Sequence, residues 1–261
     1  MELRTLASGS SGNCLLFTTE GGGVLVDCGI SCRRITTSLR ELEVDPGSLS
    51  GVLITHEHSD HIAGLAVLSR KYALPIYTSP GTARQLCCRT AGLEELIRPV
   101  EPGEPFQVGP FACTGFPTSH DAAQPMGFTL SDGEARAAVA TDLGYVTGDV
   151  LDAVLGARLV VCESNHDVDW LLSGPYPYPL RARILGDMGH LCNEAGADLA
   201  RRCAEAGART VILAHLSQEN NTPARALAVA ETALRSAGWE PGRDLVLAVA
   251  PRDRVSPPYE V

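Results

Sequence analysis

The six residues His56–His61 limit what this chain can fold into more than any other stretch. They read His-Glu-His-Ser-Asp-His and come just after the apolar run Val52–Ile54. Three imidazoles and a carboxylate this close together do not suit an ordinary core segment, because each buried polar side chain needs a partner. Imidazoles and carboxylates are ligands of divalent metals. The stretch therefore predicts two adjacent metal ions, with His56 and His58 on one face of a continuing strand at the first.

Three later segments each end an apolar run in one further ligand type. These ligands are His120, Asp142 and His215. We expect one ion to be held by His56, His58 and His120, and the other by Asp60, His61 and His215. Asp142 is expected to bridge them, since two-metal hydrolase sites hold their ions only a few ångströms apart. Asp27, which ends another apolar run, is interpreted as an acceptor that orients a ligand imidazole from behind.

Composition indicates one globular α/β unit. The chain has 261 residues, 44% of them apolar, and residues 1–261 are expected to form a single domain. No apolar run is long enough to span a membrane. The nine cysteines lack a C-x-x-C pair, and no basic, apolar leader opens the chain, so we expect reduced thiols and a cytoplasmic location. The net charge of −10 argues against diffuse nucleic-acid binding, although bound metal ions would offset part of it.

Hydrophobic periodicity and turn residues predict strands early in the chain, followed by mixed strands and helices. The expected strands are 3–7, 13–18, 23–27, 51–55, 158–162, 209–213 and 245–249, with antiparallel strands inside 105–117 and 126–140. Five helices are expected. The first contains Ile35–Leu42, the second is His61–Tyr72, and the third begins after Ser79. The fourth is capped by Asn193 and ends near Gly207, and the fifth runs from Pro223 to Gly238. The proline-rich tail after residue 250 is expected to be loose.

These motifs resemble the metallo-β-lactamase fold signature, whose five motifs occur here in order. They are Asp27, then His56, His58, Asp60 and His61, then His120, Asp142 and His215. The resemblance implies a four-layer αββα sandwich with a dinuclear site at one edge between two sheets. Antibiotic-cleaving members usually carry a cysteine at the position of Asp142, so the resemblance implies a hydrolase of the phosphodiesterase or thioester type.

Finer motifs resemble two nuclease groups of this fold. Segments around Glu163, Gly189-His190-Leu191 and Leu213–Ser217 are similar to the tRNase Z-like nucleases. By that resemblance Asp60, His190 and Glu163 are candidate catalytic residues. His190 would donate a proton to a leaving oxygen, and Glu163 would fix its tautomer.

The YycJ (WalJ) branch is a closer likeness, carried by the strings Ala7–Asn13, Glu163–Asp167, Tyr176–Ile184 and His215–Pro223. That resemblance implies a cytoplasmic 5′→3′ exonuclease acting on double-stranded DNA ends and associated with mismatch repair. One departure is Cys192, where the branch tends to carry serine, so a phosphate contact from that hydroxyl would be weakened here.

Several residues are candidates to bind phosphate. Arg181 and Arg183 follow a proline-rich stretch and are suited to clamping an anion. Ser10, Ser11 and Asn13 lie in a glycine-rich loop and are candidate donors to a phosphate oxygen. The 72 residues between Asp142 and His215 are too few for the inserted cap of the β-CASP nucleases.

Two other interpretations stay open at this point. A small-molecule hydrolase acting on a cyclic phosphodiester, thioester or lactone would be favoured by a closed apolar pocket, whereas an open basic groove would favour DNA. A non-catalytic scaffold would be expected to lack a ligand, and none is lacking. The ligand types suit zinc and also allow manganese. The sequence indicates no membrane partner and leaves protein partners undefined.

Overall fold

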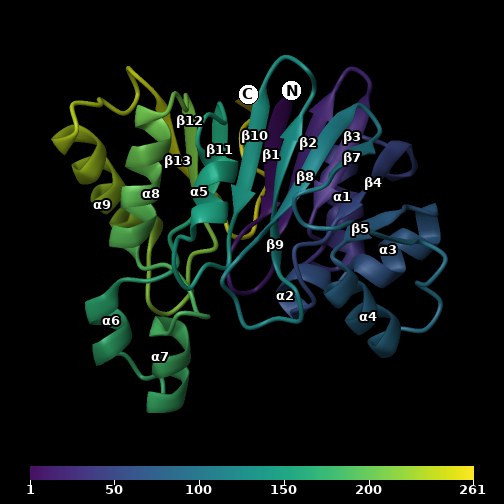
Figure 1. Ribbon diagram of the computed structural model, residues 1–261, viewed down its shortest axis with the longest axis horizontal. Coiled ribbons are helices and arrows are strands. Elements are labelled where there is room, and N and C mark those ends of the chain that lie inside the picture. The colour runs from purple at the N-terminus through teal and green to yellow at the C-terminus, as the bar shows by residue number, and fades with distance from the viewer.

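The computed structural model describes residues 1–261 and consists of two seven-stranded sheets packed face to face (Figure 1). The first sheet has the order β14-β1-β2-β3-β4-β5-β6. Its strands are β1 Glu2–Ala7, β2 Cys14–Thr19, β3 Gly22–Val26, β4 Leu49–Leu53, β5 Ile76–Thr78, β6 Ile97–Pro99 and β14 Tyr259–Glu260. Strands β1 to β3 pair antiparallel, and β3 to β6 pair parallel.

The second sheet has the order β13-β12-β11-β10-β9-β8-β7. Its strands are β7 Pro105–Val108, β8 Phe111–Pro117, β9 Met126–Ser131, β10 Arg136–Ala140, β11 Leu159–Glu163, β12 Thr210–Ala214 and β13 Val246–Val249. Strands β7 to β10 pair antiparallel, and β10 to β13 pair parallel. This arrangement gives β8, β10, β11 and β12 the same direction, so their carboxyl ends meet at one edge.

Helices cover the outer face of each sheet, which makes four layers. The first sheet is covered by α1 Cys32–Glu41, α3 Leu65–Tyr72 and α4 Pro80–Arg89, and the second by α5 Gly148–Val154, α8 Asn193–Glu205 and α9 Pro223–Ser236 (Figure 1). A third apolar cluster, which includes Phe17, Phe111 and Phe128, fills the space between the sheets. The predicted αββα sandwich is confirmed. None of the helices is both long and apolar enough to cross a membrane.

Three short helices lie at the lower edge in Figure 1, beyond the carboxyl ends of the strands. They are α2 Ser59–Ile62, α6 Val168–Ser173 and α7 Tyr178–Leu185, and a single 3₁₀ turn, η1 Pro46–Ser48, precedes β4. Helices α6 and α7 project away from the two sheets as a pair. The same edge carries the predicted ligands, because β3, β4, β8, β10, β11 and β12 all end there.

Several predicted boundaries need correction. Strand β4 ends at Leu53, so His56 and His58 lie in an irregular segment rather than on a continuing strand. The helix predicted over 61–72 is two helices, α2 and α3, with Gly64 at the junction. A Cβ on Gly64 would lie 2.2 Å from the carbonyl oxygen of Ile30, so this close approach of two backbones requires glycine.

Two further predictions are wrong near the second half of the chain. Asn193 is the first residue of α8 rather than its cap, and its side chain is engaged by Ser164 and Asn221 instead. The tail is not loose, because β14 pairs with β1 at the edge of the first sheet, and the amide of Ser256 donates to Thr5 O at 2.9 Å. The added strand covers an otherwise unpaired sheet edge.

The core between the sheets should dominate stability. Phe128 on β9 is fully buried there, so Phe128→Ala removes a large apolar side chain and leaves a cavity. We expect the free energy of unfolding to fall by about 3–5 kcal/mol, measured by urea denaturation. Val67 on α3 is 60% exposed, so Val67→Ala should change stability by less than about 0.5 kcal/mol. Equal losses for the two variants would contradict the four-layer packing.

Candidate metal centre

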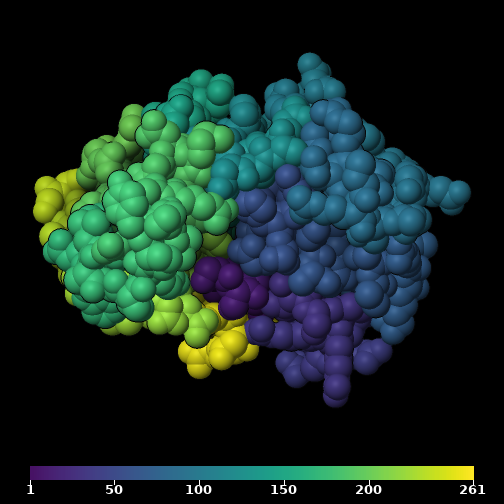
Figure 2. Space-filling model, turned by 90° about the horizontal axis from the view of Figure 1, so that it is seen from below, coloured from purple at the N-terminus to yellow at the C-terminus, as the bar shows by residue number.

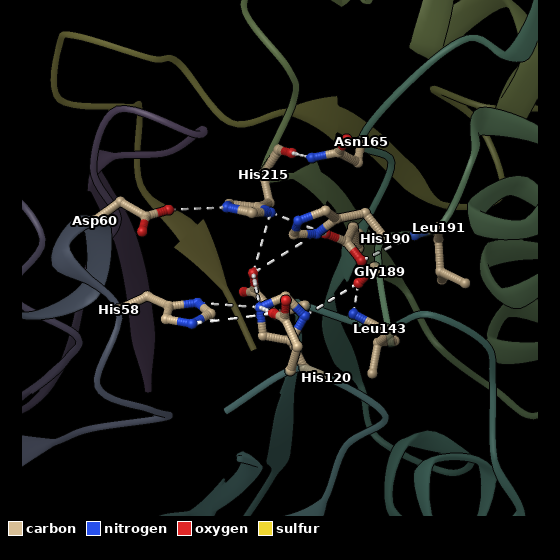
Figure 3. Close-up of polar contacts among 12 residues, drawn as sticks. His58, Asp60, His120, Leu143, Asn165, Gly189, His190, Leu191 and His215 are labelled. Carbon is tan, nitrogen blue, oxygen red and sulfur yellow. Dashed lines mark hydrogen bonds and ion pairs between the residues drawn. The ribbon is translucent and has the colours of Figure 1, made fainter. Parts of the chain in front are cut away.

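The predicted ligands come together at the edge where the strands end. Four groups of side chains there each place their ligand atoms within 4.8 Å of one another. The groups are His56, His58 and His120; Asp60, His61 and His215; His56, His61 and Asp142; and Asp142, Glu163, His190 and His215. Figure 3 shows His58 and His120 on one side of the cluster and Asp60 and His215 on the other. Loops that are far apart in the sequence thus supply one compact site.

The first half of the cluster contains three imidazoles. His56 Nε2 lies 3.1 Å from His58 Nδ1, and His120 Nε2 lies 3.3 Å from the same atom. The second half contains Asp60 Oδ2, which lies 3.5 Å from His61 Nε2 and 3.4 Å from His215 Nε2. Tetrahedral ligand atoms around one ion at about 2.1 Å lie about 3.4 Å apart, so both spacings fit a divalent metal.

Asp142 lies between the two halves. Its Oδ1 is 3.7 Å from His120 Nε2, and its Oδ2 is 3.5 Å from His61 Nε2. The carboxylate is buried, and Oδ2 has no hydrogen-bond partner in the protein. A buried charged oxygen without a partner is costly, and a cation beside it removes that cost. The donor set and this unpartnered oxygen both fit a divalent cation beside Asp142.

Asp27 is hydrogen bonded to the histidine motif at the edge of the first sheet. His61 Nδ1 donates to Asp27 Oδ2 at 2.7 Å, which leaves His61 Nε2 turned toward Asp60. The Thr55 amide and hydroxyl also donate to Asp27, and the hydroxyl accepts from His56 Nδ1 at 3.1 Å. Asp27 therefore holds two imidazoles, one directly and one through Thr55.

Glu163 likewise accepts hydrogen bonds from histidines at the edge of the second sheet, and it accepts more of them than the sequence indicated. Its Oε1 accepts from His190 Nδ1 and from His215 Nδ1, each at 2.8 Å. Its Oε2 accepts from the amides of Leu143 and Leu191 at 2.8 and 3.1 Å (Figure 3). Four donors thus hold one fully buried carboxylate. The predicted Glu163–His190 pair is present, and the link to His215 is additional.

Three site residues have strained backbones. Asp27, Asp142 and His215 have φ values of 62°, 60° and 58°, in the left-handed region that residues other than glycine rarely adopt. Each follows directly, or after one residue, on a buried strand. Such strain is retained where the surrounding structure fixes a functional side chain. Here it turns each ligand or orienting group from the strand direction into the cluster.

Some of the candidate phosphate-binding residues are exposed to solvent, and others are hydrogen bonded or ion-paired within the protein. Ser10 and Ser11 are exposed, whereas Asn13 is buried and exchanges hydrogen bonds with Gly9 N and O. Arg183 is exposed and forms a two-pronged ion pair with Asp121, whose Oδ1 is 3.4 Å from His120 Nε2. The Arg183 guanidinium therefore lies at the rim of the cluster. Arg181 is turned away toward the carbonyl of Leu172.

Some contacts of the site had no signal in the sequence. His120 Nδ1 donates to Gly189 O at 3.1 Å, and Asn165 Nδ2 donates to His215 O at 2.9 Å. Glu57, the acidic residue inside the histidine motif, accepts from Ala123 N and Thr82 Oγ1. Glu57 therefore fastens the loop between β8 and β9 rather than joining the cluster. These partners are backbone groups or distant side chains, which no local pattern reveals.

Comparison with known proteins identifies the family. Residues 23–216 match the β-lactamase superfamily domain. The chain is 39% identical over 229 residues to exodeoxyribonuclease YycJ of Bacillus anthracis, covering 85% of this chain and 84% of that protein. It is 38% identical to exodeoxyribonuclease WalJ of Streptococcus pneumoniae, covering 83% of this chain and 81% of that protein. The chain belongs to the metallo-β-lactamase superfamily.

Within this superfamily the chain lies in the YycJ/WalJ branch and is a metal-dependent hydrolase. The fold agrees. The metallo-β-lactamase fold protein YhfI of Bacillus subtilis superposes with a TM-score of 0.70 at 19% identity, over 98% of both chains. The five signature motifs predicted from the sequence are those whose side chains meet at the edge between the sheets.

The carboxylates and imidazoles of the cluster shift one another's pKa values. Burial alone would lower the pKa of His215, but the nearby carboxylates, Asp142 above all, outweigh it and raise the pKa to about 10. Burial also opposes a charge on His61, yet Asp142 and Asp27 raise its pKa well above the usual range. Burial would raise the pKa of Glu163, but His190 and His215 lower it to about 2. The metal-free cluster therefore holds protons at neutral pH.

Metal binding should release these protons. A metal ligand must be a neutral imidazole, so His61 and His215 must each give up one proton when an ion binds. We expect about two protons released per chain at neutral pH, and weaker apparent metal affinity as the pH falls. Titration calorimetry in buffers of different ionisation enthalpy measures this number. Release of no protons would show that these two imidazoles do not serve as ligands.

Proposed function

We propose that the chain, acting as one domain over residues 1–261, hydrolyses phosphodiester bonds as a 5′→3′ exonuclease on double-stranded DNA. The relatives named exodeoxyribonuclease, which match more than four fifths of the chain, support a nucleic-acid substrate. The observation that carries the chemistry is the Glu163–His190 pair at the border of the ligand cluster. The proposal includes a role in DNA repair.

Two divalent ions, zinc or manganese, are part of the proposal. His56, His58 and His120 would hold one, Asp60, His61 and His215 the other, and Asp142 would be shared. Such ions activate water and neutralise charge on the phosphoryl group when bound. Asp27 and Glu163 support this by fixing which nitrogen of His61 and of His215 faces the cluster.

His190 is proposed as the proton donor to the leaving oxygen. Its Nδ1 is bound to Glu163 at 2.8 Å, whereas its Nε2 makes no hydrogen bond within the protein. The side chain is 18% exposed, and its ring lies 5.0 Å from that of His120 and 5.2 Å from that of His215. A nitrogen open to solvent beside the metal ligands is placed to protonate a departing oxygen. Asp60 is proposed to assist in catalysis from the opposite side.

The phosphate contacts complete the proposal. Ser10 and Ser11 are exposed in the loop whose Ser8 hydroxyl accepts from the amide of His215 at 2.9 Å. Arg183 borders the other side of the cluster through Asp121. A scissile phosphate between these groups would be contacted from both sides. Cys192 is half-buried just before α8, and a phosphate contact from it would be weaker than one from serine.

Substitution of His190 separates proton transfer from metal binding. His190→Ala should retain both metals and lower kcat roughly 10²–10⁴-fold, the usual contribution of a general acid. Elemental analysis and steady-state kinetics on DNA measure the two quantities. His120→Ala is the matched comparison and should lose metal. Loss of metal from His190→Ala would show that His190 is a ligand and not the proton donor.

Asp142 should be the most sensitive metal ligand. Asp142→Ala removes the one carboxylate that faces both halves of the cluster, so metal content should fall more than it does in any single-histidine variant. Elemental analysis after reconstitution with excess zinc or manganese measures this. A wild-type protein that binds one ion or none under the same conditions would refute the dinuclear proposal.

The substrate proposal is tested with end-labelled DNA. The metal-loaded protein should degrade linear duplexes from their 5′ ends and leave closed circles intact, followed on denaturing gels. Arg183→Ala should slow this without removing metal, because Arg183 borders the cluster through Asp121. Hydrolysis of a small thioester or lactone, with no metal-dependent cutting of any DNA, would instead favour the small-molecule alternative.

A further inference from the structure

An open groove of about 640 Å³ runs between α1 and the C-terminal segment, residues 251–256. One side is formed by α1 and its N-cap Ser31, where Ser31, Arg34, Ser38 and Glu41 recur at helical spacing. Three arginines line it, namely Arg33, Arg34 and Arg254, together with the carboxylates Glu41 and Asp253. We call it the α1 groove. It lies outside every ligand group described above.

Two of the three arginines of the α1 groove are available to a ligand, unlike many others in this chain. The chain carries a net charge of −10, and arginines elsewhere on its surface, such as Arg183, Arg201, Arg235 and Arg243, are paired with carboxylates. Arg33 and Arg254 are exposed and form neither an ion pair nor a side-chain hydrogen bond. With three arginines against the two carboxylates Glu41 and Asp253, the groove keeps a small local positive charge in an acidic protein, which suits phosphate.

Two contacting segments lie between the α1 groove and the metal cluster. Arg34 Nη2 donates to Arg252 O at 3.5 Å, and Arg252 Nη2 donates to Ser217 O at 3.2 Å, two residues beyond His215. Arg252 Nη1 is buried without a protein partner. A Cβ on Gly9 would lie 3.8 Å from Arg252 Cγ, so the Ser8–Asn13 loop packs against the same arginine.

The Ser8–Asn13 loop also contacts both the start of the groove and the metal cluster. A Cβ on Gly12 would lie 2.7 Å from Ile30 Cγ2, directly before the start of the groove at Ser31, and Asn13 N donates to Asp60 O at 2.8 Å. Figure 2 shows the face with the early, purple loop at its centre, next to the yellow C-terminal segment and the indigo region of α1. The exposed Ser10 and Ser11 thus lie between the cluster and the groove.

We propose that the α1 groove holds the sugar-phosphate backbone of the DNA substrate beyond the phosphate being cleaved. The stretch Ser31–Ser38 spans about 10 Å along the helix, which corresponds to the axial rise of about three nucleotides of one strand. Arg33 and Arg34 at the start of α1 and Arg254 on the C-terminal segment would contact phosphates of that strand. This inference rests on the proposed function and adds where the rest of the substrate lies.

The test removes charge from the groove without touching the metal cluster. Arg33→Ala with Arg254→Ala is the groove variant. Arg235→Ala with Arg243→Ala, on α9 and before β13, is the control with the same change in net charge. Three quantities are measured: metal content, turnover of bis(p-nitrophenyl) phosphate, and affinity for a short labelled duplex as a function of salt. The small diester lacks the further nucleotides that the groove is proposed to hold.

The groove variant should keep its metals and its turnover of the small diester. Its affinity for the duplex should fall roughly 10- to 100-fold, and the slope of log affinity against log salt should become shallower by about 1.8, for two lost phosphate contacts. The control variant should change neither. The charge reversal Arg33→Glu with Arg254→Glu should weaken DNA binding further, which gives a second measurement on exposed side chains.

Two results would contradict the inference in different ways. If the groove variants bind DNA with the affinity and salt slope of the control, the backbone does not lie in the α1 groove, although wild-type cutting of DNA would leave the nuclease proposal standing. If the wild-type protein hydrolyses the small diester but neither binds nor cuts DNA, the proposed function itself is wrong, and this inference with it.

Discussion

The hydrogen bonds to the buried Glu163 carboxylate are the interaction on which the site depends. One oxygen binds both His190 and His215, and the other binds the backbone amides of Leu143 and Leu191. A charged group this deeply buried is stable only when fully hydrogen bonded. Because the four donors come from three separate segments, Glu163 also fixes the relative positions of those segments. Removing its charge would release a proposed metal ligand and the proposed proton donor together.

The architecture explains why such a site forms between two sheets. Strands from both sheets end at the same edge, and the chain turns sharply there, with Asp27, Asp142 and His215 in left-handed conformations. Each sheet contributes one orienting carboxylate, Asp27 in the first and Glu163 in the second. The apolar layer between the sheets holds these two halves in register, so packing far from the cluster sets distances within it.

Electrostatics connect the site to the proposed substrate. The cluster concentrates carboxylates and imidazoles that favour cations, whereas the α1 groove beside it carries arginines that favour phosphate. An acidic protein of this kind would bind DNA through a few defined contacts rather than over its whole surface.

The sequence by itself determined the candidate ligand residues and most strands, because apolar periodicity and metal-ligand chemistry are local properties, and its resemblance to a known family implied the αββα fold. It also indicated the Glu163–His190 pair through resemblance. It extended the strand before His56 too far and predicted one helix where Gly64 separates two. It also took Asn193 as the cap of α8 and predicted a loose tail where β14 pairs with β1. Only the tertiary structure decided these features, the double role of Glu163 and the α1 groove. Each depends on contacts between residues distant in the chain, which no local pattern records.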